Sequence, residues 1–411
     1  MTSEVIVMNK NGLGMASDSA AVLMPRRKTF LRQNKIFPLT RQEPIGIMIN
    51  ERLRLNGVPW ETIIKAYYVE EGHKTFDHLE AHLKNFLHFI KSHEFLFDHN
   101  DPEYFWVCDV LNYLENLEYK IKTQWRYDTN ITGQDIKLDD YAIHYIESMI
   151  YELQKTPHIS PQKLSSEIKN YLNTADPIAF EQSLNLIPMN DQNWPLLKRL
   201  ISLLSDRDEF SLGYSQVIIA GFGNKDFLPL VTSAQIGGIY FRHLKHKIHP
   251  AQRISKNNQA QIIPFASTET VTSFLKGAHP AYEQFSIDTL HSILDDIFET
   301  HVKTGSKNNF IEAHLDIYIE EISGHVASKH ILPIIEGITF LSTQELSSVA
   351  ESLVKMAHFK TSVAPGQNYI GGDIDVASIT KGDGFEWVKC KTPHHNDSLE
   401  DVYQRRQKKY E

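Results

Sequence analysis

The sequence predicts an α+β protein in which antiparallel sheets are covered by helices. Its short apolar runs come in consecutive pairs, and each pair is joined by a polar or glycine-containing turn signal. Long stretches with helical periodicity separate these pairs, so the order is strands, helices, strands, helices and strands. Strands that arrive as sequential hairpins favour antiparallel pairing over a doubly wound parallel sheet, in which single strands alternate with helices.

The composition narrows the class of protein. The 411 residues are 41% hydrophobic and can supply a large core, while 51 acidic residues against 42 basic ones give a formal charge of −9. This excess of acid disfavours nucleic acid or an anionic membrane as the main partner. The two cysteines, Cys108 and Cys390, exclude a disulfide framework. The sequence has no signal-peptide pattern and no apolar stretch of about 18 residues that could span a membrane. We therefore expect a soluble, cytoplasmic protein.

The first fifty residues predict two hairpins. An apolar run at 5–8 is followed by a turn signal at 9–12 and by an extended segment of small residues at 13–18. A second pair covers 35–39 and 45–49, with a polar turn between them.

Helical periodicity dominates from about residue 57 to residue 210. Apolar residues fill one helical face within 76–90 and again within 143–153. This stretch is too long for a connector, so we expect a helical subdomain or insertion.

The second half of the chain again alternates strand pairs with helical stretches. Extended character returns at 216–222 and 227–232, after which helices are expected to dominate again. A Ser-Thr-Gln-Glu capping box at 342–345 predicts the start of a further helix. A last hairpin is expected from 374–379 and 385–388.

These elements predict a discontinuous core with one large insertion. We assign the core to 2–56 and 211–395 and expect the helices of 57–95 to belong to it. Residues 96–210 form the predicted helical insertion, and 396–411 a solvated tail.

Thr2 is the residue that most strongly suggests chemistry. It directly follows Met1, and because threonine is small we expect Met1 to be removed, which leaves a free α-amine beside a hydroxyl. An α-amine with a pKa near 8 can act as the base for the hydroxyl of its own residue. A nearby cation would keep both pKa values down, and a carboxylate would hold that cation. Asp18 ends the second predicted strand and Lys35 begins the third, so both can lie beside Thr2 at one sheet edge.

Three features occur together in this chain: Thr2, the segment Met15-Ala16-Ser17-Asp18-Ser19-Ala20, and the segment Asn34-Lys35-Ile36-Phe37-Pro38. In this combination the chain resembles the N-terminal nucleophile hydrolases, and specifically proteasome β-type subunits. The resemblance extends over about 2–95, 213–300 and 340–390. It implies a four-layer αββα sandwich, with two antiparallel sheets between helical layers. It also implies a threonine-nucleophile hydrolase that cleaves amide or peptide bonds, needs no cofactor and no metal, and assembles into a homo-oligomer.

The sequence departs from the family at several supporting positions. Where the family has a glycine-rich turn with an oxyanion donor, this chain has Ile49-Asn50-Glu51-Arg52, so the donor carries over to the backbone of Asn50 or Glu51. Ser267 is the best match to the serine near the nucleophile. Gln367 and Ile370 replace two residues that usually support the site.

These departures keep three readings open. The first is the active amidohydrolase, and the second is a catalytically inactive, proteasome-like scaffold subunit. The third is a binding module in which the helical insertion recognises a partner. At the residue level, Asp18 could also simply cap a turn, and Lys35 could be an exposed charge at a strand end.

Other candidate sites are weaker. His243, His246 and His249 recur every third residue, and His394 and His395 lie near Cys390, but neither group has the spacing of a closed zinc site. We interpret these histidines as surface residues.

Overall fold

The computed structural model contains two five-stranded antiparallel sheets, so the mixed α+β class predicted from the sequence is confirmed. It describes residues 3–23, 28–30, 33–93, 96, 102–132, 136–158, 160–188, 190–207, 210–266, 268–302, 306–363 and 371–391. We call one sheet, with strand order β12-β1-β2-β13-β14, the N-terminal sheet, and the other, with order β11-β10-β9-β6-β5, the second sheet.

The strands of the N-terminal sheet are β1 (Ser3–Asn9), β2 (Gly12–Asp18), β12 (Ala260–Ala266), β13 (Ile374–Thr380) and β14 (Gly384–Lys389). Those of the second sheet are β5 (Ile36–Pro38), β6 (Ile45–Glu51), β9 (Ser215–Gly221), β10 (Leu230–Tyr240) and β11 (His243–Arg253). Two short pairs add β3 (Ala21–Leu23) with β4 (Lys28–Phe30) and β7 (Arg54–Leu55) with β8 (Val58–Pro59).

The helices of the first half are α1 (Trp60–Glu70), α2 (Leu79–Ser92), α3 (Tyr104–Thr132), α4 (Leu138–Lys155), α5 (Gln162–Thr174), α6 (Ile178–Glu181) and α7 (Asn193–Asp206). The later helices are α8 (Glu269–Lys276), α9 (Pro280–Ile297), α10 (Lys307–Val326), α11 (Leu332–Thr339) and α12 (Thr343–Val363). Short π-helical segments follow α9 at Phe298–Val302 and α10 at Ala327–Ile331.

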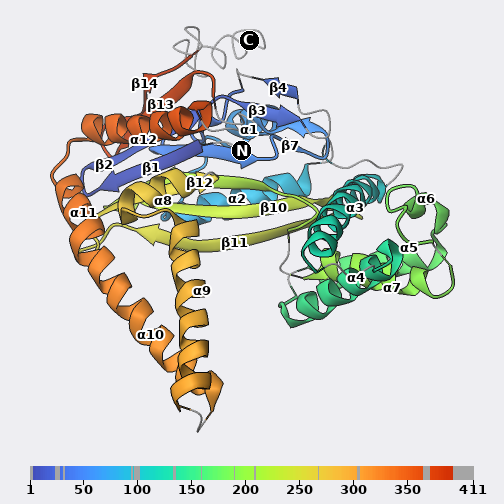
Figure 1. The fold of residues 1–411 in the computed structure, drawn as a ribbon. Coiled ribbons are helices and arrows are strands. Elements are labelled where there is room, and N and C mark those ends of the chain that lie inside the picture. The colour runs from blue at the N-terminus through green and yellow to red at the C-terminus, as the bar shows by residue number, and fades with distance from the viewer. Residues whose placement is uncertain are drawn as a thin grey trace.

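The two sheets pack face to face through a shared apolar layer. Alternate residues of each strand point into this layer, as Ile6 and Met8 do from β1 and Ile218 and Ala220 do from β9. The opposite face of the N-terminal sheet packs against α12, through residues such as Val5 and Leu346. The opposite face of the second sheet packs against α1 and α2. Helices therefore cover the outer face of each sheet (Figure 1).

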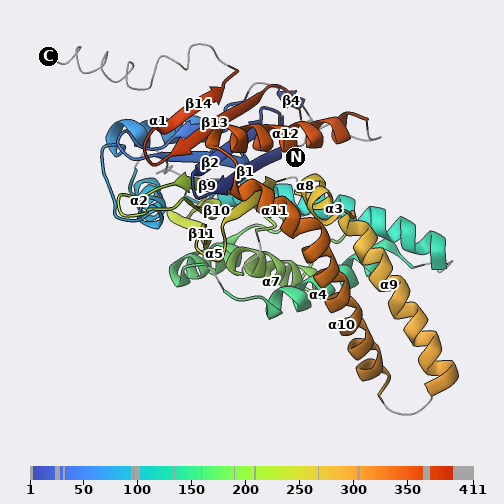
Figure 2. The same ribbon diagram turned by 90° about the vertical axis from the view of Figure 1, so that its left-hand side faces the viewer.

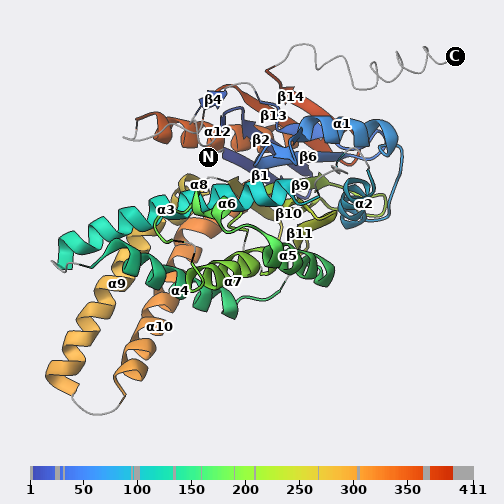
Figure 3. The same ribbon diagram turned by 90° about the vertical axis from the view of Figure 1, so that its right-hand side faces the viewer.

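Helices α3 to α7 bury a cluster of their own. Its residues come from all five of these helices and include Trp106, Leu164 and Leu200, with Tyr240 joining from the end of β10. In Figure 3 these helices lie together on one side of the sheets. Helices α9 and α10 form a separate long hairpin that projects away from the sheets (Figure 2).

The predicted hairpins are present, but two long strands, β11 and β12, and the four short strands β3, β4, β7 and β8 were missed. β1 pairs with β2, β5 with β6, β9 with β10 and β13 with β14, all antiparallel. The expectation that helices dominate directly after residue 232 is wrong, because β10 runs on to Tyr240 and β11 and β12 follow it. The capping box is confirmed: the Ser342 amide donates to Glu345 Oε2 at 2.8 Å at the start of α12.

No helix in the described part of the chain is both long enough and apolar enough to cross a membrane.

Candidate functional site

The start of β1 is held between two strands. Ser3 pairs with Ala266 of β12, and the next residue, Glu4, pairs with Ser17 of β2. The backbone N–H of Ser3 donates to Asp18 Oδ1 at 3.0 Å. Thr2 lies outside the described residues, and its neighbour Ser3 is the first residue that the structure places next to the Asp18 carboxylate.

Asp18 and Lys35 form a buried ion pair at this position. Lys35 Nζ lies 2.8 Å from Asp18 Oδ1, and each residue is only 1% exposed. The second carboxylate oxygen, Oδ2, accepts the N–H of Gly371 at 3.0 Å. A buried ion pair is tolerable only when its remaining polar atoms are also hydrogen bonded, and the two backbone donors meet that need for Asp18. The structure thus brings two of the predicted site residues into contact and places neither at the surface.

Glu4 is a second buried carboxyl beside this pair. It lies on the face of β1 that points toward the second sheet and is fully buried. Its Oε1 accepts from the Ser17 hydroxyl, and its Oε2 accepts from Asn50 Nδ2, both at 3.2 Å. Burial raises the pKa of Glu4 to about 8, although the Lys35 ammonium acts to lower it. At pH 7 the carboxyl is therefore mostly protonated and neutral.

Asn50 is the predicted oxyanion residue, and it is the second-last residue of β6, on the opposite side of the interface. Its side chain is buried and hydrogen bonded to Glu4, which links the second sheet to β1. Glu51, the next residue, has a φ of 63°. A side chain is strained in this left-handed region, and such strain in proteins is concentrated at functional sites.

Arg52 connects this turn to the helices of the predicted insertion. Its Nη1 donates to both oxygens of Asp109 on α3 at 2.8 Å, and its Nη2 donates to the carbonyl of Leu212. The Tyr240 hydroxyl donates to Asp109 Oδ2 at 2.7 Å. The position of the Asn50 turn therefore depends on a residue of α3.

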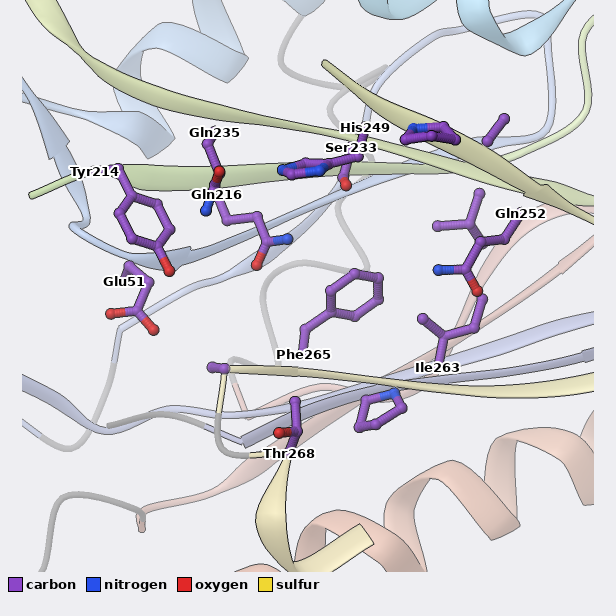
Figure 4. A pocket seen from close by; sticks show the side chains of 15 residues that line it. Glu51, Tyr214, Gln216, Ser233, Gln235, His249, Gln252, Ile263, Phe265 and Thr268 are labelled. Carbon is purple, nitrogen blue, oxygen red and sulfur yellow. The ribbon is translucent and has the colours of Figure 1, made fainter. Parts of the chain in front are cut away.

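A cavity of about 610 Å³ opens between the sheets at the same end (Figure 4). Its walls come from β9, β10, β11 and β12, with Glu51 and Tyr214 at one end. Ala266, which pairs with Ser3, lines the cavity and has a φ of 59°. The cavity therefore reaches β12 at the residue that pairs with Ser3, and two of its lining residues, Glu51 and Ala266, have left-handed backbones.

The remaining predicted residues have different outcomes. Ser267 lies outside the described residues, but Ala266 and Thr268 on either side of it both line the cavity. Gln367 and Ile370 also lie outside, whereas Gly371 contributes the hydrogen bond to Asp18. None of the roles suggested for these residues is tested by their positions.

The three histidines of the every-third-residue pattern lie in the described part of the chain, and they form no metal site there. His243, His246 and His249 all lie on β11, and no group of three or more possible metal-ligating side chains occurs among the described residues. His394 and His395 fall outside the described part of the chain, and Cys390 is half-buried.

Sequence reasoning missed Glu4, Arg52 and two inward-facing glutamines, Gln216 and Gln235. Glu4 could have been identified, because alternate residues of a strand lie on the same face. It therefore shares a face with the apolar residues Ile6 and Met8, which predicts that it is buried. No sequence pattern identifies Arg52 or the two glutamines. Their partners are distant in the sequence and become neighbours only through strand pairing and helix packing.

No family model matches this chain, and no curated protein matches it significantly.

Proposed function

We propose that this protein is an N-terminal threonine amidohydrolase with the four-layer fold of the N-terminal nucleophile hydrolases, similar to a proteasome β-type subunit. One observation carries the proposal: the buried Asp18–Lys35 pair is hydrogen bonded to the backbone N–H of Ser3, the residue directly after Thr2. A buried cation and carboxylate at this position are what an N-terminal nucleophile requires, and they are costly to bury for packing alone.

The proposed reaction uses the chain's own amine as the base. After removal of Met1, the neutral α-amine of Thr2 accepts the hydroxyl proton while the hydroxyl oxygen attacks the carbonyl carbon of an amide. The C–N bond then breaks, the leaving amine takes the proton, and an ester with Thr2 remains. Water, deprotonated by the same amine, hydrolyses this ester and regenerates the hydroxyl. No redox partner is needed.

The neighbouring groups have distinct roles in this proposal. The Lys35 ammonium favours the neutral amine and stabilises negative charge that develops at the hydroxyl oxygen. Asp18 holds Lys35 in place. The backbone N–H of Asn50 is the proposed oxyanion donor, and the Glu4 carboxyl positions Asn50 through its side chain.

The decisive test starts with the intact mass of the purified protein. We expect the loss of one methionine residue, together with hydrolysis of a mixed library of fluorogenic peptides. Thr2→Ala should abolish this hydrolysis, Thr2→Ser should retain part of it, and the control Ser3→Ala should retain a hydroxyl at residue 2 and therefore the activity. If Met1 is retained and the wild type hydrolyses no peptide, the non-catalytic scaffold is favoured instead. The residues Asn50 and Glu51, which replace the family's glycine-rich oxyanion turn, are also consistent with such a scaffold.

The resemblance also suggests self-association. Closed symmetric oligomers are the usual outcome for proteins that bind copies of themselves, so we propose a homo-oligomer. Light scattering at micromolar concentration tests this, and a monomer mass would remove the ring analogy without affecting the chemistry proposed for Thr2.

A further inference from the structure

The inward face of the second sheet changes from apolar to amide side chains at the end where the site lies. Met48 and Ile218 are paired on β6 and β9 and belong to the layer between the sheets. One inward position further along the same strands, Asn50 pairs with Gln216, and Gln216 pairs with Gln235 of β10. Directly paired residues of an antiparallel sheet point to the same face. Three carboxamides therefore form a row across three strands.

Two members of this row lack hydrogen-bond partners. Asn50 is bonded to Glu4, but the side-chain amides of Gln216 and Gln235 bond to no other described residue. Both project into the cavity, where Phe265 faces them from the N-terminal sheet (Figure 4). Polar groups that sit between two sheets without a protein partner gain most from a ligand that satisfies them.

The cavity lies against β12, the strand that pairs with the start of β1. Asp18 approaches β1 from the β2 side, whereas the cavity adjoins β1 on the β12 side, through the pairs Ser3–Ala266 and Glu4–Phe265. A chain bound across the start of β1 would thus place its reacting carbonyl near the ion pair and a neighbouring side chain in the cavity.

The lining defines the chemistry of that side chain. The described lining residues include no lysine or arginine, and their one carboxylate, Glu51, is exposed at the end of the cavity. Each glutamine amide offers both donors and an acceptor, so its best complement is another group that offers both. Ile263 and Phe265 provide apolar surface for methylene groups. A volume of about 610 Å³ holds a side chain of this kind together with some adjoining backbone.

We propose that this cavity is a subsite for a carboxamide side chain, of glutamine type, that lies next to the amide bond to be cleaved. The juxtaposition of Gln216 and Gln235 with the apolar wall of Phe265, beside the start of β1, carries the inference. It rests on the proposed amidohydrolase function for its reaction, but the binding step can be measured separately.

The experiment uses five fluorogenic peptides that differ only at one position next to the scissile bond. This position holds glutamine, asparagine, glutamate, lysine or leucine. With the wild type we expect the glutamine peptide to have the highest kcat/KM. Gln216→Leu and Gln235→Leu should each raise KM for that peptide about tenfold, because one half-buried hydrogen-bonding group that would contact the peptide is lost, and should leave kcat nearly unchanged. The leucine peptide should not be impaired by either change. Gln344→Leu, an exposed position at the start of α12, is the matched control and should alter nothing.

Calorimetric binding of the same peptides to the Thr2→Ala variant separates the two proposals. If the glutamine peptide binds best and both substitutions weaken it while the wild type cleaves nothing, the subsite stands and the hydrolase proposal fails. If the wild type cleaves peptides without a preference for glutamine, or prefers lysine or glutamate, the subsite proposal is overturned and the hydrolase stands. Equal binding of all five peptides would overturn the subsite as well.

Discussion

Arg52 reaches from the turn after β6 to Asp109 on α3 and donates from Nη1 to both carboxylate oxygens at 2.8 Å. Asn50, the proposed oxyanion residue, is two positions from this arginine, and Glu51 between them has a φ of 63°. The helices of residues 104–206 are therefore tied to the candidate site through one partly buried carboxylate, and they do more than pack on one another.

Asp109→Ala should destabilise the protein by about 2–4 kcal/mol. The change leaves the buried Tyr240 hydroxyl and the partly exposed Arg52 guanidinium without their shared acceptor. Urea unfolding measures the effect, and Glu115→Ala, an exposed carboxylate on the same helix, is the control that should stay within about 0.5 kcal/mol of the wild type. If the two variants were equally stable, Asp109 would not hold the turn.

Lys35→Met should destabilise the fold by about 3–5 kcal/mol, because it leaves the Asp18 carboxylate buried without its cation. Adding Asp18→Asn to that variant should recover much of the loss. The matched control is Lys225→Met, which breaks an exposed ion pair with Asp77 and should cost less than about 1 kcal/mol. Additive costs for Lys35 and Asp18 in a double-mutant cycle would contradict a direct interaction.

Any hydrolytic activity that remains in Lys35→Ala should shift in pH dependence. In the proposed mechanism, loss of the Lys35 cation lets the α-amine of Thr2 hold its proton to a higher pH, so the acidic limb of the rate profile should move to higher pH. An unchanged profile with lower stability would limit Lys35 to a structural role.

The sequence predicted the parts of the site that depend on local strand order. Asp18 ends one strand and Lys35 precedes another, so strand reading alone could suggest that they meet. It failed at β11 and β12, which are edge strands of their sheets. Edge strands tolerate proline and polar residues. The usual strand pattern is therefore interrupted by Pro250 and the basic residues in β11 and by Pro264 in β12. The amide row needed the register between β6, β9 and β10, which no local pattern contains.

Glu4 should make the stability of the protein fall as pH rises. Its pKa is about 8 in the folded state and about 4.5 when exposed, so between these values the folded state keeps a proton that the unfolded state releases. The free energy of unfolding therefore declines from pH 4.5 to pH 8, by at most about 1.4 kcal/mol per pH unit from this one group. Glu4→Gln should remove this slope and be more stable than the wild type at pH 8. Glu386→Gln, at an exposed position of β14, should leave the slope intact.

Glu51→Gly should stabilise the turn, although glycine usually weakens a strand end. The backbone of Glu51 at φ 63° places its Cβ in strain of about 1–2 kcal/mol, which glycine does not experience. Glycine also makes the unfolded chain more flexible, which offsets about 0.4–1 kcal/mol of this gain. Glu51→Ala removes the same carboxylate but keeps the Cβ, so the glycine variant should be up to about 1 kcal/mol more stable than the alanine variant by urea unfolding. If alanine were the more stable of the two, the residue would not be strained, and the link between this turn and a functional site would lose its backbone evidence.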